Sequence, residues 1–170
     1  MKGLARISGI CLFAALMFLP GAHAQSVRTI FFVRHADKVS DETDAGLSDA
    51  GRRRAACLAK TLSDSNIERI YVSDLQRTQQ TAAPLAEQLH IKPVAIPLAK
   101  VDDLIAAIRS DKAANILVVW HDLTLPKILR ALGAPEITPI GHTEYDHFFV
   151  LTFDADKNSQ PRFTALRYCD

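Results

Sequence analysis

The feature of this sequence that most restricts its fold is a set of short apolar runs separated by helix-like segments. Four runs are rich in β-branched and aromatic residues and are too short to be core helices: residues 29–34 (TIFFVR), 67–72 (IERIYV), 93–96 (PVAI) and 116–120 (ILVVW). Such runs favour strands buried on both faces, and helices between them favour parallel pairing. The sequence therefore predicts an α/β fold, a three-layer sandwich with a mainly parallel central sheet.

The segments between and after these runs carry the signals of helices and of two closing strands. The expected helices cover residues 48–61, 74–89, 102–109 and 124–132, and the closing strands cover residues 148–153 and 163–168. Ser48 is expected to cap the first helix, and Ser73 or Asp74 the second. Because no internal repeat, biased segment or linker interrupts the pattern, residues 25–170 are expected to form one domain.

The first 24 residues have the organisation of a secretory signal peptide. Lys2 and Arg6 form a basic start, an apolar run covers residues 7–19, and an Ala-x-Ala sequence ends at Ala24. The apolar run is shorter than the roughly 20 residues that a membrane-spanning helix needs. We therefore expect cleavage after Ala24 and a periplasmic or secreted product with no membrane anchor.

The net charge and the number of cysteines argue against two classes of protein, nucleic-acid-binding proteins and small disulfide-rich scaffolds. The formal net charge is +1, from 20 basic and 19 acidic residues, so nothing in the composition indicates a nucleic-acid partner. Three cysteines are too few for a disulfide-dense scaffold. Cys57 and Cys169 would remain after signal cleavage in an oxidising compartment, where a disulfide between them and two free thiols are both open. The sequence assigns no oligomeric state.

Cationic side chains follow three of the predicted strands. Arg34 ends the first run and His35 follows it directly, Arg77 lies early in the helix after the second, and His121 comes directly after the fourth. Ligands of such sheets bind at the carboxyl ends of the strands, so these side chains are expected to converge. Two arginine forks suit a phosphoryl group, a neutral imidazole can attack phosphorus, and a second, protonated imidazole would stabilise the transition state.

At these residues the sequence resembles the histidine phosphatase superfamily, the phosphoglycerate-mutase-like group. The resemblance runs from Ile30 to Leu132 and rests on four segments in the family's order: FFVRHADK, LSDAGRRRA, YVSDLQRTQQTAAPLA and ILVVWHDLTL. It implies a phosphoglycerate-mutase-like fold and a reaction in two steps, without metal or cofactor. It also implies that His35 is the phosphorylated nucleophile, with Arg34, Arg77 and His121 completing the phosphate site.

The residue that protonates the leaving group is open at this point. The connection before the fourth segment is too short for the helical lid that supplies a glutamate in larger members. Members that resemble acid phosphatases use an aspartate directly after the second histidine, and Asp122 has this place. Asp102 and Asp103 are the other candidates, although carboxylates there also suit the start of a helix. Two further departures from the family pattern are Asp37 in place of glutamate and Arg54 in place of glutamine.

The sequence does not predict a metal site. His35 with Asp37, and His142 with His147, lack a third ligand at a recognisable spacing. The stretch Glu144-Tyr145-Asp146 resembles one at the rim of the pocket in small secreted members, but a turn before a strand explains it equally well.

The function expected from the sequence is that of an extracytoplasmic, metal-independent phosphatase that acts on a phosphorylated substrate through a phosphohistidine. A catalytically inactive protein that binds a phosphorylated ligand, a phosphotransferase or mutase, and a secreted metal-dependent hydrolase are the alternatives.

Overall fold

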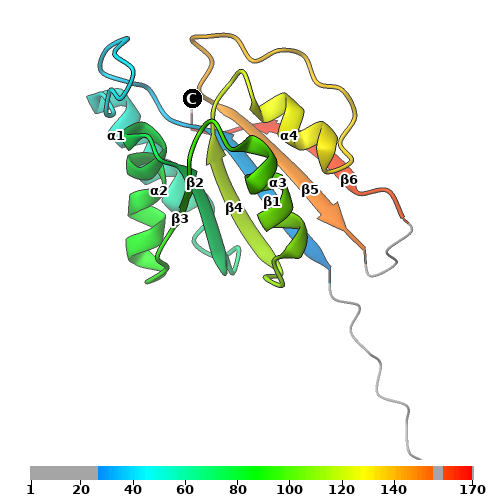
Figure 1. Cartoon of the computed structure of the whole chain (residues 1–170). Helices are drawn as coiled ribbons and strands as arrows, with labels where there is room; N and C mark the ends of the chain where they lie inside the picture. Colours follow the sequence, from blue (N-terminus) through cyan, green and yellow to red (C-terminus); the bar gives the residue numbers. More distant parts are fainter. Residues whose placement is uncertain (1–26, 155–158, 170) are drawn as a thin grey trace, which may run out of the picture.

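The computed structural model describes residues 27–154 and 159–169. Within them the chain forms six strands and four helices that alternate through most of its length (Figure 1). In chain order these are β1 (Arg28–Arg34), α1 (Asp49–Thr61), β2 (Arg69–Ser73), α2 (Gln76–Gln88), β3 (Val94–Ile96), α3 (Val101–Ser110), β4 (Asn115–Trp120), α4 (Leu125–Ala131), β5 (His147–Phe153) and β6 (Arg162–Arg167). The predicted signal peptide, residues 1–24, lies outside the described residues. None of the helices in the described ranges is long and apolar enough to cross a membrane.

The strands form one mixed sheet in the order β3-β2-β4-β1-β5-β6. The first four strands of the chain run parallel, whereas β5 is antiparallel to β1 and β6 is antiparallel to β5. Phe32 in β1 pairs with Val118 of β4 on one side and with Phe149 of β5 on the other. The predicted α/β fold with a mostly parallel sheet is confirmed, and its antiparallel strands lie together at one edge.

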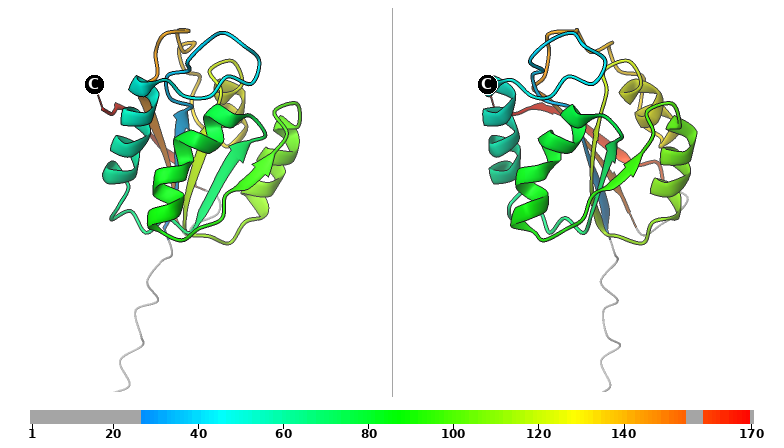
Figure 2. Two further views of the ribbon diagram at one scale, coloured as in Figure 1. Left: turned by 90° about the vertical axis from the view of Figure 1, so that its left-hand side faces the viewer. Right: turned by 60° about the vertical axis from the view of Figure 1, so that its left-hand side comes forward.

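Helices cover both faces of the sheet, as Figure 2 shows. Because successive side chains of a strand point to opposite faces, each central strand contributes to two apolar clusters. In β4, Ile116 and Val118 pack with α3 and α4, whereas Leu117 and Val119 pack with α1 and α2. The continuous apolar runs of the sequence are explained by this burial on two sides.

The caps of the first two helices differ from each other. Ser48 caps α1, and its hydroxyl accepts a hydrogen bond from the backbone N–H of Gly51, as expected. The cap predicted for α2 is wrong, because Leu75 is its N-cap residue and provides no side-chain cap. Ser73 instead remains in β2, completely buried, where its hydroxyl is available to the site described below.

A disulfide joins Cys57 of α1 to Cys169 near the C-terminus, so the pairing left open by the sequence is present. Arg54, one turn before Cys57, donates from Nη1 to the Cys169 carbonyl at 2.7 Å and from Nε to an Asp37 carboxylate oxygen at 2.8 Å. The two departures from the family pattern, Asp37 and Arg54, therefore form an ion pair with each other. This pair connects the segment after β1 to α1 and to the end of the chain.

Candidate active site

The carboxyl ends of three adjacent strands, β2, β4 and β1, bring together the four residues singled out in the sequence. The rings of His35 and His121 have their centroids 5.2 Å apart. Nη2 of Arg77 lies 3.4 Å from Nδ1 of His121. Arg34 precedes His35 at the end of β1, and Arg34 and His35 are both almost completely buried. The arrangement expected from the strand ends is thus the one observed.

His35 is held as a neutral imidazole with one nitrogen available. Its Nδ1 lies 2.8 Å from the carbonyl oxygen of Ala36, which can only accept, so Nδ1 carries the proton and Nε2 keeps its lone pair. The pKa of His35 is lowered to about 3, chiefly because burial disfavours the imidazolium, with smaller contributions from His121 and the two arginines. At neutral pH the ring is therefore uncharged, and the Nε2 lone pair has the chemistry that attack on phosphorus requires.

The backbone around His35 is fixed by neighbours from the sheet and from α2. The His35 N–H donates to the Trp120 carbonyl at 2.9 Å, and the Ala36 N–H donates to the hydroxyl of Thr81 at 2.9 Å. Trp120 itself is fully buried in the core, with its ring centroid 5.8 Å from that of His121. These bonds fix the backbone that carries the imidazole before any ligand arrives.

Arg34 is anchored by backbone carbonyls of residues 141–146, the loop that precedes β5. Its Nη1 donates to the carbonyl oxygens of Gly141, His142 and Glu144, at 2.9, 2.8 and 3.1 Å. The guanidinium carbon lies 4.3 Å from the centre of the Tyr145 ring, whose centroid is 5.9 Å from that of His35. The stretch around Tyr145 therefore lies at the site, where its loop holds the arginine in place.

The 141–146 loop is itself fixed through Glu144. The carboxylate of Glu144 accepts from the Gly141 N–H at 2.7 Å and lies 3.1 Å from Nε2 of His147. The pKa of Glu144 is lowered to about 2, first by the Gly141 hydrogen bond, and then by His147 and Arg167. The anchoring carboxylate is therefore ionised throughout the physiological pH range.

Both arginines keep one buried N–H without a partner. Nε of Arg34 and Nε of Arg77 are buried and have no hydrogen-bond acceptor among the described residues. Buried donors of this kind are normally satisfied, so two of them beside the neutral imidazole of His35 point to an anionic ligand. Arg77 is positioned for this role by its Nη1, which donates to the Thr43 carbonyl at 2.7 Å.

His121 is neutral in the ligand-free protein, in contrast to the protonated second histidine considered from the sequence. Because the guanidinium of Arg77 can only donate, Nδ1 of His121 accepts, and Nε2 donates to the Ser73 hydroxyl at 2.9 Å. Burial, followed by the charges of Arg77 and Arg34, lowers the pKa of His121 to about 3. The Ser73 hydroxyl also contacts that of Thr78 at 2.9 Å. Ser73 thereby orients His121. From the sequence alone this role is missed, because Ser73 is assigned there to a helix cap.

The three candidate acids have different surroundings. Asp122 lies beside the site, with a carboxylate oxygen 3.0 Å from Nη2 of Arg34 and 3.5 Å from Nδ1 of His142. Asp102 and Asp103 are exposed in the first turn of α3, where carboxylates interact favourably with the helix N-terminus, and Asp102 pairs with Lys127. Of the three, Asp122 is the one that contacts a residue of the site.

Within residues 27–154 and 159–169, no group of three or more His, Cys, Asp or Glu side chains is arranged to hold a metal ion. His142 contacts Asp122, and His147 contacts Glu144. His142 and His147, which were considered as metal ligands, therefore pair with carboxylates in and beside the loop that holds Arg34.

Comparison with known proteins agrees with this architecture. The model of the histidine phosphatase superfamily (branch 1) matches residues 30–99, which include three of the four residues brought together here. This part of the chain belongs to the superfamily. The protein of Yersinia enterocolitica described as "Probable phosphoglycerate mutase GpmB" is 33% identical over 75 residues, which cover 40% of this chain and 35% of that protein. The match therefore spans about a third of the relative's length.

Solved structures resemble this chain over a larger part of its length than the sequence matches do. The chain superposes on the protein histidine phosphatase SixA complexed with tungstate with a TM-score of 0.62 and 24% identity, covering 82% of this chain and 96% of that one. For the phosphoserine phosphatase of Entamoeba histolytica in complex with 3-phosphoglyceric acid, the TM-score is 0.60 and the identity 15%, over 82% and 96% of the two chains. The fold is thus close to that of the small SixA-like phosphatases.

Proposed function

We propose that this protein is an extracytoplasmic phosphatase that hydrolyses a phosphomonoester through a phosphohistidine at His35, without a metal ion. The observation that carries the proposal is a neutral, buried imidazole whose Nε2 is available beside two arginines with unpartnered Nε–H groups. Several proteins similar to this chain are named as phosphatases, and one as a phosphoglycerate mutase. Their names agree with phosphoryl transfer at this site.

The first chemical step forms a bond between phosphorus and Nε2 of His35. Phosphoryl oxygens accept hydrogen bonds from Nε of Arg34 and Nε of Arg77, which orients phosphorus toward the imidazole lone pair. As the P–N bond forms, the bond to the leaving oxygen breaks, and that oxygen takes a proton to leave as the alcohol. The Nδ1 hydrogen bond to the Ala36 carbonyl stabilises the positive charge that develops on the ring.

The second step returns the enzyme to its starting state. Water attacks the phosphorus of the phosphohistidine, the P–N bond breaks, and its electron pair returns to Nε2 as inorganic phosphate departs. The proton lost by the attacking water replaces the one that was given to the alcohol. The same two arginines hold the phosphoryl oxygens through both steps, because neither phosphorus nor His35 needs to move far.

Turnover in the presence of a chelator tests this proposal on the wild-type protein. Because the site supplies its positive charge from arginine, we expect release of inorganic phosphate from p-nitrophenyl phosphate at a rate unaffected by EDTA. An inactive binding protein would bind vanadate without turnover, and a metal-dependent hydrolase would lose activity on chelation. A mutase would return the phosphoryl group to an organic acceptor and would release little inorganic phosphate.

We propose Asp122 as the group that protonates the leaving oxygen. In the ligand-free protein its carboxylate lies 3.0 Å from Nη2 of Arg34, which places it beside the phosphoryl group that this arginine would bind. Asp122→Asn keeps an oxygen that can accept from Arg34 but has no acidic proton. We expect this variant to lose at least about tenfold more kcat on an alkyl phosphate than on p-nitrophenyl phosphate, whose leaving group needs little protonation.

The comparison of leaving groups also separates the two roles open to Asp122. An equal loss on both substrates would show that Asp122 only positions Arg34. The double variant Asp102→Asn/Asp103→Asn serves as the control, because both residues are exposed on α3, and it should retain full activity on both substrates.

The extracytoplasmic location is supported by the signal-like start of the sequence and by the Cys57–Cys169 disulfide, a bond that persists in oxidising compartments. When the full chain is exported by a bacterial host, N-terminal sequencing should find Gln25 as the first residue. Mass spectrometry of the unreduced protein should then find no free thiol. Soluble protein that begins at Met1, or that carries two free thiols, would contradict the proposed location.

A further inference from the structure

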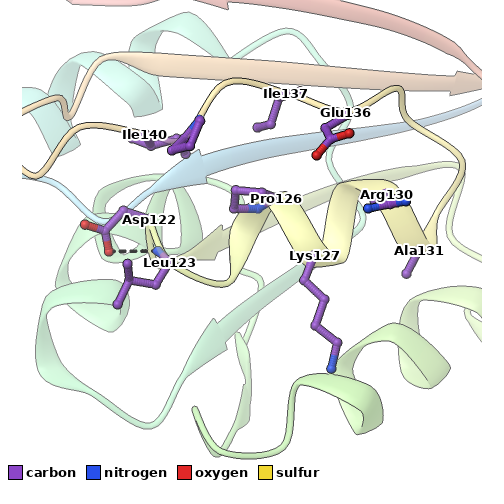
Figure 3. A pocket seen from close by; sticks show the side chains of 10 residues that line it. Asp122, Leu123, Pro126, Lys127, Arg130, Ala131, Glu136, Ile137 and Ile140 are labelled. Carbon is purple, nitrogen blue, oxygen red and sulfur yellow. Dashed lines mark hydrogen bonds between the residues drawn. The ribbon is translucent and has the colours of Figure 1, made fainter.

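A groove of about 580 Å³ lies between α4 and the segment that follows it, residues 134–140. Figure 3 shows Pro126 and Arg130 on the helix side and Ile137 and Ile140 on the segment side, with Asp122 at one end. None of these residues belongs to the phosphate site described above except Asp122. We refer to this feature as the α4 groove.

The α4 groove begins where the candidate active site ends. Asp122 lines the groove and also holds Nη2 of Arg34 at 3.0 Å. Ile140, on the opposite wall, directly precedes Gly141, whose carbonyl accepts from Nη1 of Arg34. A phosphomonoester whose phosphoryl group is bound by Arg34 would therefore have the near end of the groove beside its alcohol part.

The lining of the groove is mainly apolar. The apolar residues are Leu123, Pro126, Ala131, Ile137, Pro139 and Ile140. Leu123, directly after Asp122, is 89% exposed, which leaves a large apolar side chain in water at the mouth of the groove. An exposed leucine is common on its own, but one that continues an apolar cavity next to a reactive centre indicates a contact with a ligand.

The charges of the groove do not favour a second anionic group. Lys127 turns toward α3, where its Nζ is 2.8 Å from Asp102 (Figure 3). Arg130 and Glu136 contribute one charge of each sign and lie on opposite walls. The groove therefore has no excess of cations to attract a carboxylate or a further phosphate on the substrate.

We propose that the α4 groove binds the alcohol part of the substrate, and that the substrate is a phosphomonoester with an uncharged, apolar alkyl or aryl group. The proposal rests on the proposed function, since it requires a phosphoryl group at His35. The helix that forms one wall has seven residues and is about 10 Å long. An apolar group up to about that length is buried along the wall.

A series of linear alkyl phosphates, from methyl to octyl, tests this assignment on the purified protein. Each methylene buried in the groove should raise kcat/KM by about two- to fourfold, until the chain is longer than about 10 Å. The readout is the ratio of kcat/KM for octyl phosphate to that for methyl phosphate. Equal values across the series would overturn the proposal.

A pair of matched variants assigns the effect to the groove. Leu123→Asp changes an exposed side chain, so the fold is retained, and we expect it to lower the octyl-to-methyl ratio by at least about tenfold. Leu166→Asp, on the exposed edge strand β6, makes the same replacement outside the groove and should keep the wild-type ratio. An unchanged ratio in Leu123→Asp, or an equal fall in both variants, would refute the assignment.

The outcomes also separate this proposal from the one on which it rests. If neither p-nitrophenyl phosphate nor any alkyl phosphate is hydrolysed, the proposed function fails. If all are hydrolysed with the same kcat/KM, the proposed function stands and the groove has no part in substrate binding.

Discussion

Replacement of His35 with alanine should lower phosphatase turnover by roughly 10⁴- to 10⁶-fold, the range lost when an enzyme's nucleophile is removed. The expected loss is this large because, in the proposed mechanism, the bond between Nε2 of His35 and phosphorus forms in the first step and breaks in the second. Binding of vanadate should persist, since Arg34 and Arg77 keep their charges and their unpartnered Nε–H groups. Steady-state kinetics and vanadate titration of the same preparation measure the two quantities separately.

The covalent intermediate provides a direct check on the same residue. Quenching a reaction with labelled substrate under alkaline conditions should trap a phosphoenzyme in the wild-type protein, stable to base and labile to acid, and none in His35→Ala. His90→Asn is the matched control, because His90 is exposed and has a φ of 54°, which asparagine tolerates. Full turnover in His35→Ala would refute the mechanism.

Replacement of Arg77 with alanine should lower kcat/KM by roughly 10²- to 10³-fold, as observed when one preorganised donor to a developing anion is removed. In the proposed mechanism the guanidinium contacts both ground and transition states, so KM should rise and kcat should fall. Its Nη2 also donates to His121, so the variant frees the ring of the second histidine. Vanadate affinity is the independent measurement, and it should weaken in parallel.

Two further variants separate contact from overall charge. Arg77→Lys keeps the positive charge without the planar fork and should recover only part of the loss. Arg53→Ala removes the same charge from the exposed surface of α1 and should leave both kcat/KM and vanadate affinity unchanged. Wild-type vanadate affinity in Arg77→Ala would remove this residue from the phosphate site.

The sheet and four residues of the candidate site could be predicted because they depend on local patterns. A strand buried on both faces needs a continuous apolar run, and in β1 and β4 that run is followed at once by a polar residue at the sheet edge. Arg34, His35 and His121 therefore take their places from the strand ends alone. Arg77 could be predicted because only two residues separate the end of β2 from the start of α2, so that it lies in the first turn of this helix.

The surroundings of these residues could not be predicted in the same way. Arg34 is held by the backbone carbonyls of residues 141, 142 and 144, and every residue type has a carbonyl, so no sequence signal marks them. The charge state of His121 depends on burial by distant segments, which the sequence does not display. Serine is a common helix cap, and the sequence predicted this role for Ser73. The strand β2 instead extends one residue further than predicted and includes Ser73, whose hydroxyl contacts His121.

The central place of β1 has a consequence for the order in which activity arises during synthesis. β1 is the first strand to leave the ribosome, but its two neighbours are β4 and β5, and the carbonyls that hold Arg34 come just before β5. A nascent chain that ends before residue 141 therefore carries His35, the proposed nucleophile, without the carbonyls that anchor Arg34. Contacts between such distant parts of a chain form late and slowly. Until the loop before β5 has been made, the proposed phosphate site therefore lacks its anchored arginine.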